Sequence, residues 1–323
     1  MAARGDSEPR RHHYVPQFLL RHFANERQQL RTLDLETERT YIQPVQNAAA
    51  QRDHNTTRRQ HGQPEQIAER LLGQMEHHLA RVVRMLIRGE LTAAVEAPIS
   101  IRQLIASFVL VQWARTPAGR HALSEAADAK LKRQILEAGP QRLREMFDAV
   151  RETPLNDEEA AENWRVLSDT GYYRFTDYNA NLLRAMFRNW PERQQDLAER
   201  TMILVEWSRK TLLIGDQPVL TLPRGDLERI EDIGRVDPLA ADLIVVPVCR
   251  TKALLIGPTG GIRRIWARPG TAMLARVTNE LGIVAADRHV YSHPEDDLFG
   301  IAEDRVRLRE HLILSLERLD LHE

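Results

Sequence analysis

Residues 201–219 read TMILVEWSRKTLLIGDQPV, and this stretch marks the change from a helical sequence to one rich in strands. Two apolar runs, TMILVEW (201–207) and TLLIGD (211–216), are separated by three polar residues, which predicts a pair of strands. DLIVVPV (242–248) and KALLIGP (252–258) repeat the pattern and predict a second hairpin. The last third of the chain is therefore expected to be rich in β-structure.

Upstream of this stretch, the sequence has the spacing of amphipathic helices. Apolar residues recur every three or four positions over 65–88, and Gly89 supplies a stop signal. Ser100 is placed to cap a second, almost wholly apolar helix that ends near Arg115. Further helices are expected at about 118–136, 140–151, 157–168, 178–200 and 271–286.

Together these patterns predict an α+β protein. A small N-terminal hairpin is expected within 29–45, where apolar and polar residues alternate around a polar turn. The helical part follows at about 64–200. The β-rich part at about 201–300 is expected to pack against these helices. A last helix is expected at 303–320. Residues 1–10 are polar and predict a flexible lead-in, which leaves 11–323 as a single domain.

Composition narrows the class of protein. The 323 residues include 45 basic and 46 acidic side chains, so any contact with nucleic acid would need a local patch. The single cysteine, Cys249, fits a reducing cytoplasm and lies in an apolar run where a buried thiol is expected. No run of about 18 uncharged apolar residues is present, so we expect a cytoplasmic protein without a membrane partner. A homo-oligomer is left open.

Residues 11–23, RHHYVPQFLLRHF, hold the densest set of side chains with both chemical and structural uses. Pro16 has a fixed φ and biases Val15 to an extended form, so the backbone that carries His13 is stiff. A neutral imidazole held in this way can act as a general base or as a metal ligand. In the alternative, His13 and Tyr14 cap the core and hydrogen-bond to the backbone.

Further polar side chains could join His13 in a site for a divalent metal. His12, His13 and Asp53 are the predicted ligands, with Glu76 on the first long helix as a nearby carboxylate. The sequence has no His-Glu-x-x-His motif and no CxxC pair. Glu76 also lies at the edge of the apolar stripe of its helix, where a carboxylate paired with an arginine is the structural alternative.

Arg115 and Asp216 complete the predicted site. Arg115 ends the apolar helix, where its guanidinium could satisfy the last carbonyls or bind a carboxylate or phosphate. Asp216 ends a strand and precedes Gln217-Pro218, a turn in which aspartate commonly bonds its own backbone. Strand ends also display catalytic carboxylates, so both roles stay open for Asp216.

The order of these pieces resembles a bacterial family named domain of unknown function 4238. The resemblance rests on HHYVPQFLLRHF, a polar segment with Asp53, the helix with Glu76, FVLVQWARTP, WSRKTLLIGDQPV, and Asn279 with AADRHVYS. It spans roughly 11–293, and its first motif is the most specific. Gly215 stands where similar sequences often have serine before the Asp-x-Pro turn. The resemblance implies an architecture and a set of residues, and no reaction.

Two functions follow from the residues. The first is a metal-assisted hydrolase in which His13 or a divalent metal activates water, carboxylates hold the ion, and Arg115 stabilises the developing anion. A phosphodiester or nucleic acid is the favoured substrate. HHYVP also resembles the start of His-Asn-His nucleases, although Asn25 and His54 follow at unsuitable spacing. The second function is a non-catalytic module for a partner or small ligand, in which HHYVP is structural.

Overall fold

A five-stranded sheet forms the centre of the body. The computed structural model describes residues 11–52, 54, 57–58, 64–65, 67–91, 98–175, 190–223, 232–260 and 265–298. The strands of this sheet lie in the order β12 (Ile265–Pro269), β7 (Arg200–Glu206), β11 (Lys252–Thr259), β10 (Leu243–Cys249) and β9 (Leu220–Leu222). All neighbours are antiparallel except β12 and β7. The predicted hairpin of β10 and β11 is confirmed, with Val246 opposite Leu254.

A four-stranded sheet joins the two ends of the described chain. Its order is β3 (Arg39–Pro44), β2 (Gln29–Asp34), β13 (His289–Ser292) and β8 (Ile214–Gly215). The predicted N-terminal hairpin is confirmed as β2 and β3, but β2 also pairs with β13. Two-stranded sheets are formed by β1 (Arg11–His13) with β4 (Ala50–Arg52), and by β5 (Thr57–Arg58) with β6 (Pro64–Glu65).

The predicted pairing of 201–207 with 211–216 is wrong. β7 pairs with β11 and β12, whereas β8 pairs with β13 in the other sheet. The chain between them is held by Asn279, whose side-chain oxygen accepts a hydrogen bond from the Leu213 N–H at 3.0 Å and whose amide donates to the Thr211 carbonyl at 3.0 Å. These bonds satisfy backbone groups that a hairpin would otherwise have paired.

Most of the described helices lie in the ranges that the spacing of apolar residues predicts. They are α1 (Gln17–Leu20), α2 (Ile67–Ile87), α3 (Ile99–Arg115), α4 (Pro117–Asp148), α5 (Asp157–Ser168), α7 (Trp190–Ala198) and α8 (Ala272–Ala285), with a 3-10 turn at Val45–Asn47. Gly89 follows α2 with φ 73°, as a C-terminal stop requires. Gly139, at φ 74°, bends α4 between the two helices predicted there.

The predicted cap at Ser100 is wrong. Helix α3 begins two residues earlier than such a cap predicts, at Ile99 after Pro98, and the Pro98 carbonyl accepts hydrogen bonds from Ile101 and Arg102. Proline fixes an extended entry to the helix, so Ser100 lies inside the first turn rather than before it. By contrast, Asn156 and Glu159 form the reciprocal capping box that begins α5.

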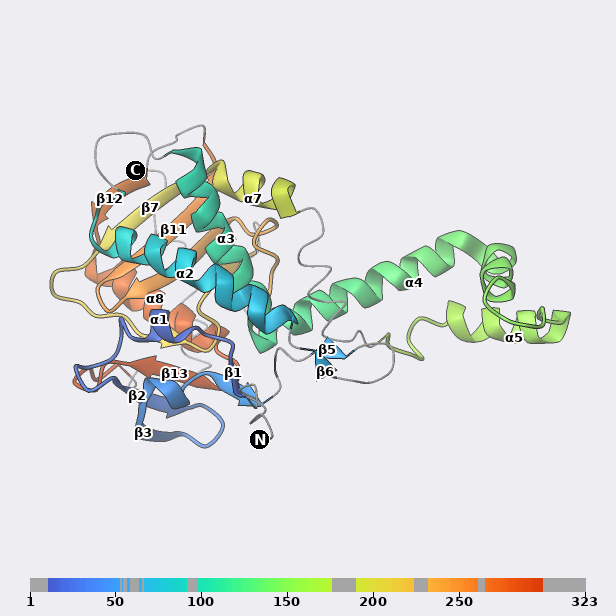
Figure 1. Cartoon of the computed structure of the whole chain (residues 1–323), viewed down its shortest axis with the longest axis horizontal. Coiled ribbons are helices and arrows are strands. Elements are labelled where there is room, and N and C mark those ends of the chain that lie inside the picture. Colours follow the sequence, from blue (N-terminus) through green and yellow to red (C-terminus); the bar gives the residue numbers. More distant parts are fainter. Residues whose placement is uncertain are drawn as a thin grey trace, which may run out of the picture.

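The arrangement places α2 and α3 against the central sheet, while α4 projects away from the body with α5 beside it (Figure 1). Residues 105–115 of α3 are buried almost without exception, so this helix lies in the core. The structure is thus an α+β fold, with strands from both ends of the described chain beside the helices.

Some predictions fall outside the described residues. These are the lead-in 1–10, Asp53, residues 178–189 of the predicted 178–200 helix, and the last helix at 303–320. Of the helices in the described ranges, none combines the length and the apolar character of a membrane span.

Candidate functional site

The doubled histidine lies on the short strand β1, where His13 is opposite Ala50 of β4. Successive side chains of a strand point to opposite faces, so His12 and His13 do not share a face. His12 is fully buried and His13 is half-buried. Pro16, with φ −66°, ends this extended segment and directs the chain into α1.

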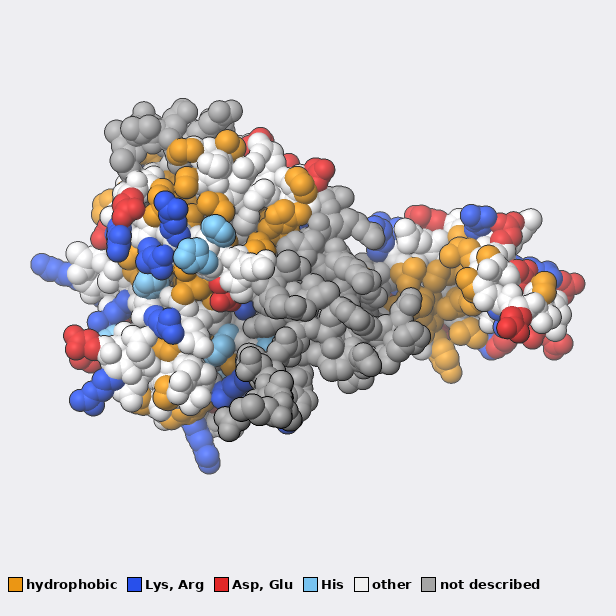
Figure 2. All heavy atoms as spheres, in the orientation of Figure 1, with side chains coloured by type: hydrophobic (Ala, Val, Ile, Leu, Met, Phe, Trp, Pro, Cys, Tyr) orange, Lys and Arg blue, Asp and Glu red, His pale blue; other side chains and the backbone are white. Residues whose placement is uncertain are grey.

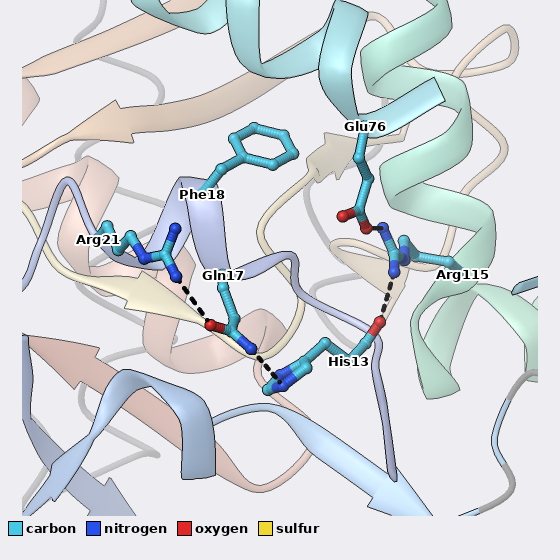
Figure 3. A pocket seen from close by; sticks show the side chains of 6 residues that line it. All are labelled: His13, Gln17, Phe18, Arg21, Glu76 and Arg115. Atoms are coloured by element: carbon cyan, nitrogen blue, oxygen red, sulfur yellow. Dashed lines mark hydrogen bonds and ion pairs between the residues drawn. The ribbon is translucent and has the colours of Figure 1, made fainter. Parts of the chain in front are cut away.

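Both ring nitrogens of His13 are hydrogen-bonded. Nδ1 lies 3.1 Å from the Ala48 carbonyl oxygen, which can only accept, so the proton is on Nδ1. Nε2 then accepts from the side-chain amide of Gln17 at 2.9 Å. The Gln17 oxygen in turn accepts from Arg21 at 3.1 Å. His13, Gln17 and Arg21 therefore form one directed row of hydrogen bonds along β1 and α1 (Figure 3).

This environment favours the neutral imidazole. Burial lowers the pKa of His13 below its usual 6.5, and the nearby charges of Arg11 and Arg115 act in the same direction. At neutral pH the ring has a lone pair on Nε2, which is the form that takes a proton or binds a metal. The hydrogen bond to Ala48 fixes the direction of that lone pair.

Arg115 connects three elements at the buried end of the site. Its side chain is 2% exposed, and it donates to Glu76 Oε1 at 2.8 Å and to the His13 carbonyl at 2.5 Å. Glu76 is thus paired with an arginine, as the structural alternative for this residue predicts, and that arginine is Arg115. These contacts join α3, α2 and β1 and neutralise a guanidinium that would be costly to bury alone. Arg115 therefore fixes the main chain of His13, while Ala48 and Gln17 fix its ring.

A pocket of about 280 Å³ lies between these groups. It is lined by His13, Gln17, Phe18, Arg21, Glu76 and Arg115. Figure 3 shows these side chains around one space, with α1 on one side and α2 and α3 on the other. Three residues of the predicted set, His13, Glu76 and Arg115, are thus brought together although 102 positions separate the first from the last.

Asp216 has a different position. It does not line this pocket, and its carboxylate accepts hydrogen bonds from three consecutive backbone N–H groups, those of Asp287, Arg288 and His289, at 2.7–2.8 Å. Burial raises its pKa to about 6, against the lowering effect of these three bonds. The side chain fixes the turn that leads into β13, and a catalytic role for it stays a prediction.

The predicted metal ligands do not form a cluster among the described residues. Asp53 lies outside them, and no group of three or more His, Cys, Asp or Glu side chains in the described ranges is arranged to hold an ion. His54 is buried instead, with Nε2 2.7 Å from the Arg115 carbonyl, and it is adjacent to Arg120, which donates to the His54 carbonyl. Burial and the charge of Arg120 lower the pKa of His54 to about 3.

Three residues that line the pocket are absent from the predicted site: Gln17, Phe18 and Arg21. A signal was present, because Gln17 and Arg21 are four residues apart and a helix begins at Gln17, so these two polar groups lie on one helical face soon after His13. The interruption of an apolar run by Arg21 was the most visible part of that signal.

One of three comparisons with known proteins found a match. No curated protein and no solved structure matches the chain. Residues 11–296 match the family described as "Protein of unknown function (DUF4238)". The match begins at the strand with the doubled histidine and ends just after β13. Since it covers most of the 323 residues, the chain belongs to this family.

Proposed function

We propose that the pocket of His13, Glu76 and Arg115 is the active site of a hydrolase that cleaves a phosphodiester. The observation that carries the proposal is the convergence of an oriented neutral imidazole, a carboxylate and two guanidinium groups on one pocket. Clefts that combine few polar groups with a perturbed titratable group are the usual sites of catalysis. A cytoplasmic location is part of the proposal, since the one cysteine, Cys249, is buried and free.

His13 acts as the base in this proposal. When water or substrate displaces the Gln17 amide, Nε2 takes a proton from water as the oxygen attacks phosphorus. The bond from phosphorus to the leaving oxygen breaks, and that oxygen takes a proton from the imidazolium. The Ala48 carbonyl remains bonded to Nδ1 throughout and stabilises the charged ring.

Arg21 is the cation best placed to bind the phosphate. Its described side-chain bond is to Gln17, and its exposed guanidinium has further donors for phosphate oxygens. Arg115 is buried and its charge is already paired with Glu76, so it contributes mainly by fixing the position of His13. The two arginines thus have different roles at opposite sides of the pocket.

A divalent metal would find one carboxylate ligand in the pocket, Glu76. Magnesium is commonly bound by one or two carboxylates, with water and substrate phosphate oxygens completing its shell. Glu76 would supply that carboxylate, since its side chain is 34% exposed and one of its oxygens is engaged by Arg115. Such an ion, when bound, would polarise the phosphate and lower the pKa of attacking water.

The test is hydrolysis of bis(p-nitrophenyl) phosphate by purified protein, with EDTA or with added magnesium, manganese or zinc. We expect release of p-nitrophenol with at least one metal, and we expect Arg21→Gln to raise KM by about tenfold, as loss of one charge-assisted contact predicts. Arg27→Gln is the matched control, because Arg27 is exposed and does not line the pocket. No turnover under any of these conditions would contradict the proposal.

A second function is a non-catalytic binding module. The observation that favours it is that both ring nitrogens of His13 and two guanidinium nitrogens of Arg115 are already bonded within the protein. In that case His13→Ala lowers the melting temperature by several degrees, whereas removal of a catalytic polar group usually leaves stability unchanged or raises it. Melting curves therefore separate the two functions.

A further inference from the structure

A row of basic side chains lies on the solvent face of α2. His77, Arg81, Arg84 and Arg88 are spaced by four, three and four residues, so they lie along one face of the helix; we call them the basic stripe. All four are exposed, and the sequence has no Asp or Glu between His77 and Gly89. Figure 2 shows arginine and histidine side chains gathered on the face of the body over α2 and α1.

Two cations of the basic stripe are available to a ligand. Within the described part of the chain, neither Arg81 nor Arg84 forms an ion pair or a side-chain hydrogen bond, whereas Arg88 lies 3.5 Å from Glu90. A bound polyanion therefore need not displace an internal partner from Arg81 or Arg84. This differs from the projecting helices α4 and α5, which we call the arm, where Arg142 and Arg165 are paired with Glu145 and Glu162.

The basic stripe adjoins the pocket. Glu76, which lines the pocket, directly precedes His77 of the stripe. Helix α1 packs on α2, and Arg84 is close enough to His22 that its charge, after burial, helps to lower the pKa of that histidine. Arg21, next to His22, lines the pocket. The positive charge thus extends from the pocket along the exposed face of α2.

We propose that the basic stripe binds the sugar–phosphate backbone of a single-stranded nucleic acid and delivers one of its phosphodiesters to the pocket. This inference rests on the proposed function and names its substrate class. From His77 to Arg88 the stripe is ~16 Å long at 1.5 Å per residue, a length over which a strand presents several phosphates. A site for a single small phosphate would instead need hydrogen-bond donors that converge on one point, and the stripe is linear.

Two features favour a strand over other polyanions. Phe18 lines the pocket and offers a ring on which an unpaired base can stack, as in many proteins that bind single strands. A duplex is less suitable, since its phosphodiesters cannot enter a pocket of about 280 Å³ without unpairing. A membrane surface is also less suitable, because the other exposed residues of α2, among its described side chains, are Gly73, Gln74 and His78 rather than large apolar anchors.

The experiment measures fluorescence anisotropy of a labelled single-stranded DNA of about 20 nucleotides, a length that exceeds common single-strand site sizes. The wild type is compared with Arg81→Gln/Arg84→Gln and with Arg142→Gln/Arg165→Gln, which removes the same charge from the arm. We expect the stripe variant to raise Kd by about tenfold or more and to reduce the slope of log K against log salt by about 1.4, or ~0.7 for each lost phosphate contact. The arm variant should remain within about twofold of the wild type.

Equal weakening by both double variants, or no binding by the wild type, would overturn the inference. So would binding of the stripe to phosphatidylserine vesicles in the absence of strand binding. The proposed function is decided separately by wild-type hydrolysis of the small diester. Strand binding through the stripe without hydrolysis keeps the binding surface and overturns the proposed function. Hydrolysis of the small diester, with strand binding that is equal in both double variants, keeps the proposed function and overturns the binding surface.

Discussion

The hydrogen bonds of His13 decide what its ring can do. The Ala48 carbonyl holds the proton on Nδ1, and the Gln17 amide donates to the lone pair on Nε2. A donor at Nε2 stabilises the neutral ring relative to the charged one, because protonation of Nε2 would break that bond. Gln17 therefore both shields the base and helps to keep it unprotonated.

Removal of this donor gives a direct prediction. In Gln17→Leu the pKa of His13 should rise relative to the wild type, since protonation of Nε2 no longer costs a hydrogen bond. The measurement is an NMR titration of the histidine Cε1–H resonances. A His13 pKa that is unchanged or lower in Gln17→Leu would show that the bond to Gln17 does not govern the ring.

For Asp216 the prediction concerns stability rather than the pKa of a ring. Asp216→Asn keeps the shape but turns an amide N–H toward the backbone N–H groups of residues 287–289, so we expect a loss of about 3 kcal/mol in the free energy of unfolding. Asp287→Asn is the control, because Asp287 is exposed and adjacent. Urea unfolding measures both. Full stability of Asp216→Asn combined with lost hydrolysis would assign Asp216 to catalysis instead.

Part of this site is predictable from the sequence. His13, Glu76 and Arg115 were expected to meet, and they line one pocket. The position of Asp216 was not predictable, because its partners are backbone groups more than 70 positions later and a backbone N–H has no sequence signature. The stacking of α1 on α2, which brings Arg21 to the same pocket, likewise depends on tertiary contacts.

The junction of α3 and α4 shows how tightly these helices are joined. Thr116 Oγ1 donates to the Trp113 carbonyl at 2.8 Å and accepts from the Gly119 N–H at 3.1 Å, which caps α4. A Cβ built on Gly119 would lie 2.0 Å from the Trp113 carbonyl oxygen. Only glycine permits this approach, and the approach sets where Arg115 leaves α3.

We therefore expect Gly119→Ala to lower the free energy of unfolding by about 2 kcal/mol or more, since backbone atoms must move to relieve the overlap. Gly73→Ala is the matched control, because that glycine is exposed on α2 with nothing within 4 Å of its added Cβ. This control should gain about 0.5–1 kcal/mol from helix propensity. Chemical denaturation measures both, and equal stability of Gly119→Ala and the wild type would refute the argument.

Helices were easier to predict than strand partners. The apolar period located α2 and the Asn156 cap located α5, because both signals are local. The pairing of β7 with β12, or of β2 with β13, joins residues 63 to 261 positions apart, and the pattern of a strand does not identify its neighbour. The hairpin of β10 and β11 was predictable because its partners are adjacent in sequence.

The net charge of the whole molecule conceals its electrostatics. Basic and acidic side chains nearly cancel, at 45 and 46, so only the structure shows the basic stripe on one face. Buried and half-buried histidines add a pH dependence of stability that the composition does not reveal. Burial lowers the pKa of four of them: His13, His22, His54 and His289.

Stability should therefore fall as the pH decreases from 7.5 to 5. Below pH 6.5 the unfolded chain binds protons that these histidines do not bind in the folded state, so each of them lowers the free energy of unfolding as the pH decreases. For His54 this continues toward pH 3. Asp216 has the opposite effect between pH 6 and 3.8, because its pKa is raised in the folded state and its protonation there stabilises the fold. It is a single group, whereas four histidines lower the stability.

Urea unfolding at pH 7.5 and pH 5 measures this effect. The free energy of unfolding should be lower at pH 5, and His54→Gln should reduce the difference, since it removes the histidine whose pKa is lowered to about 3. Equal or greater stability at pH 5 would show that these rings are not held neutral by the fold.

The most direct test of the pocket as an active site is the rate of phosphodiester hydrolysis by His13→Ala. His121→Ala is the control, because His121 lies exposed on α4 away from the pocket. We predict that His13→Ala loses about 10²–10⁴-fold in kcat, as removal of a general base does, while it remains folded at the assay temperature and His121→Ala keeps the wild-type rate. A His13→Ala protein that hydrolyses the substrate as fast as the wild type would contradict the account.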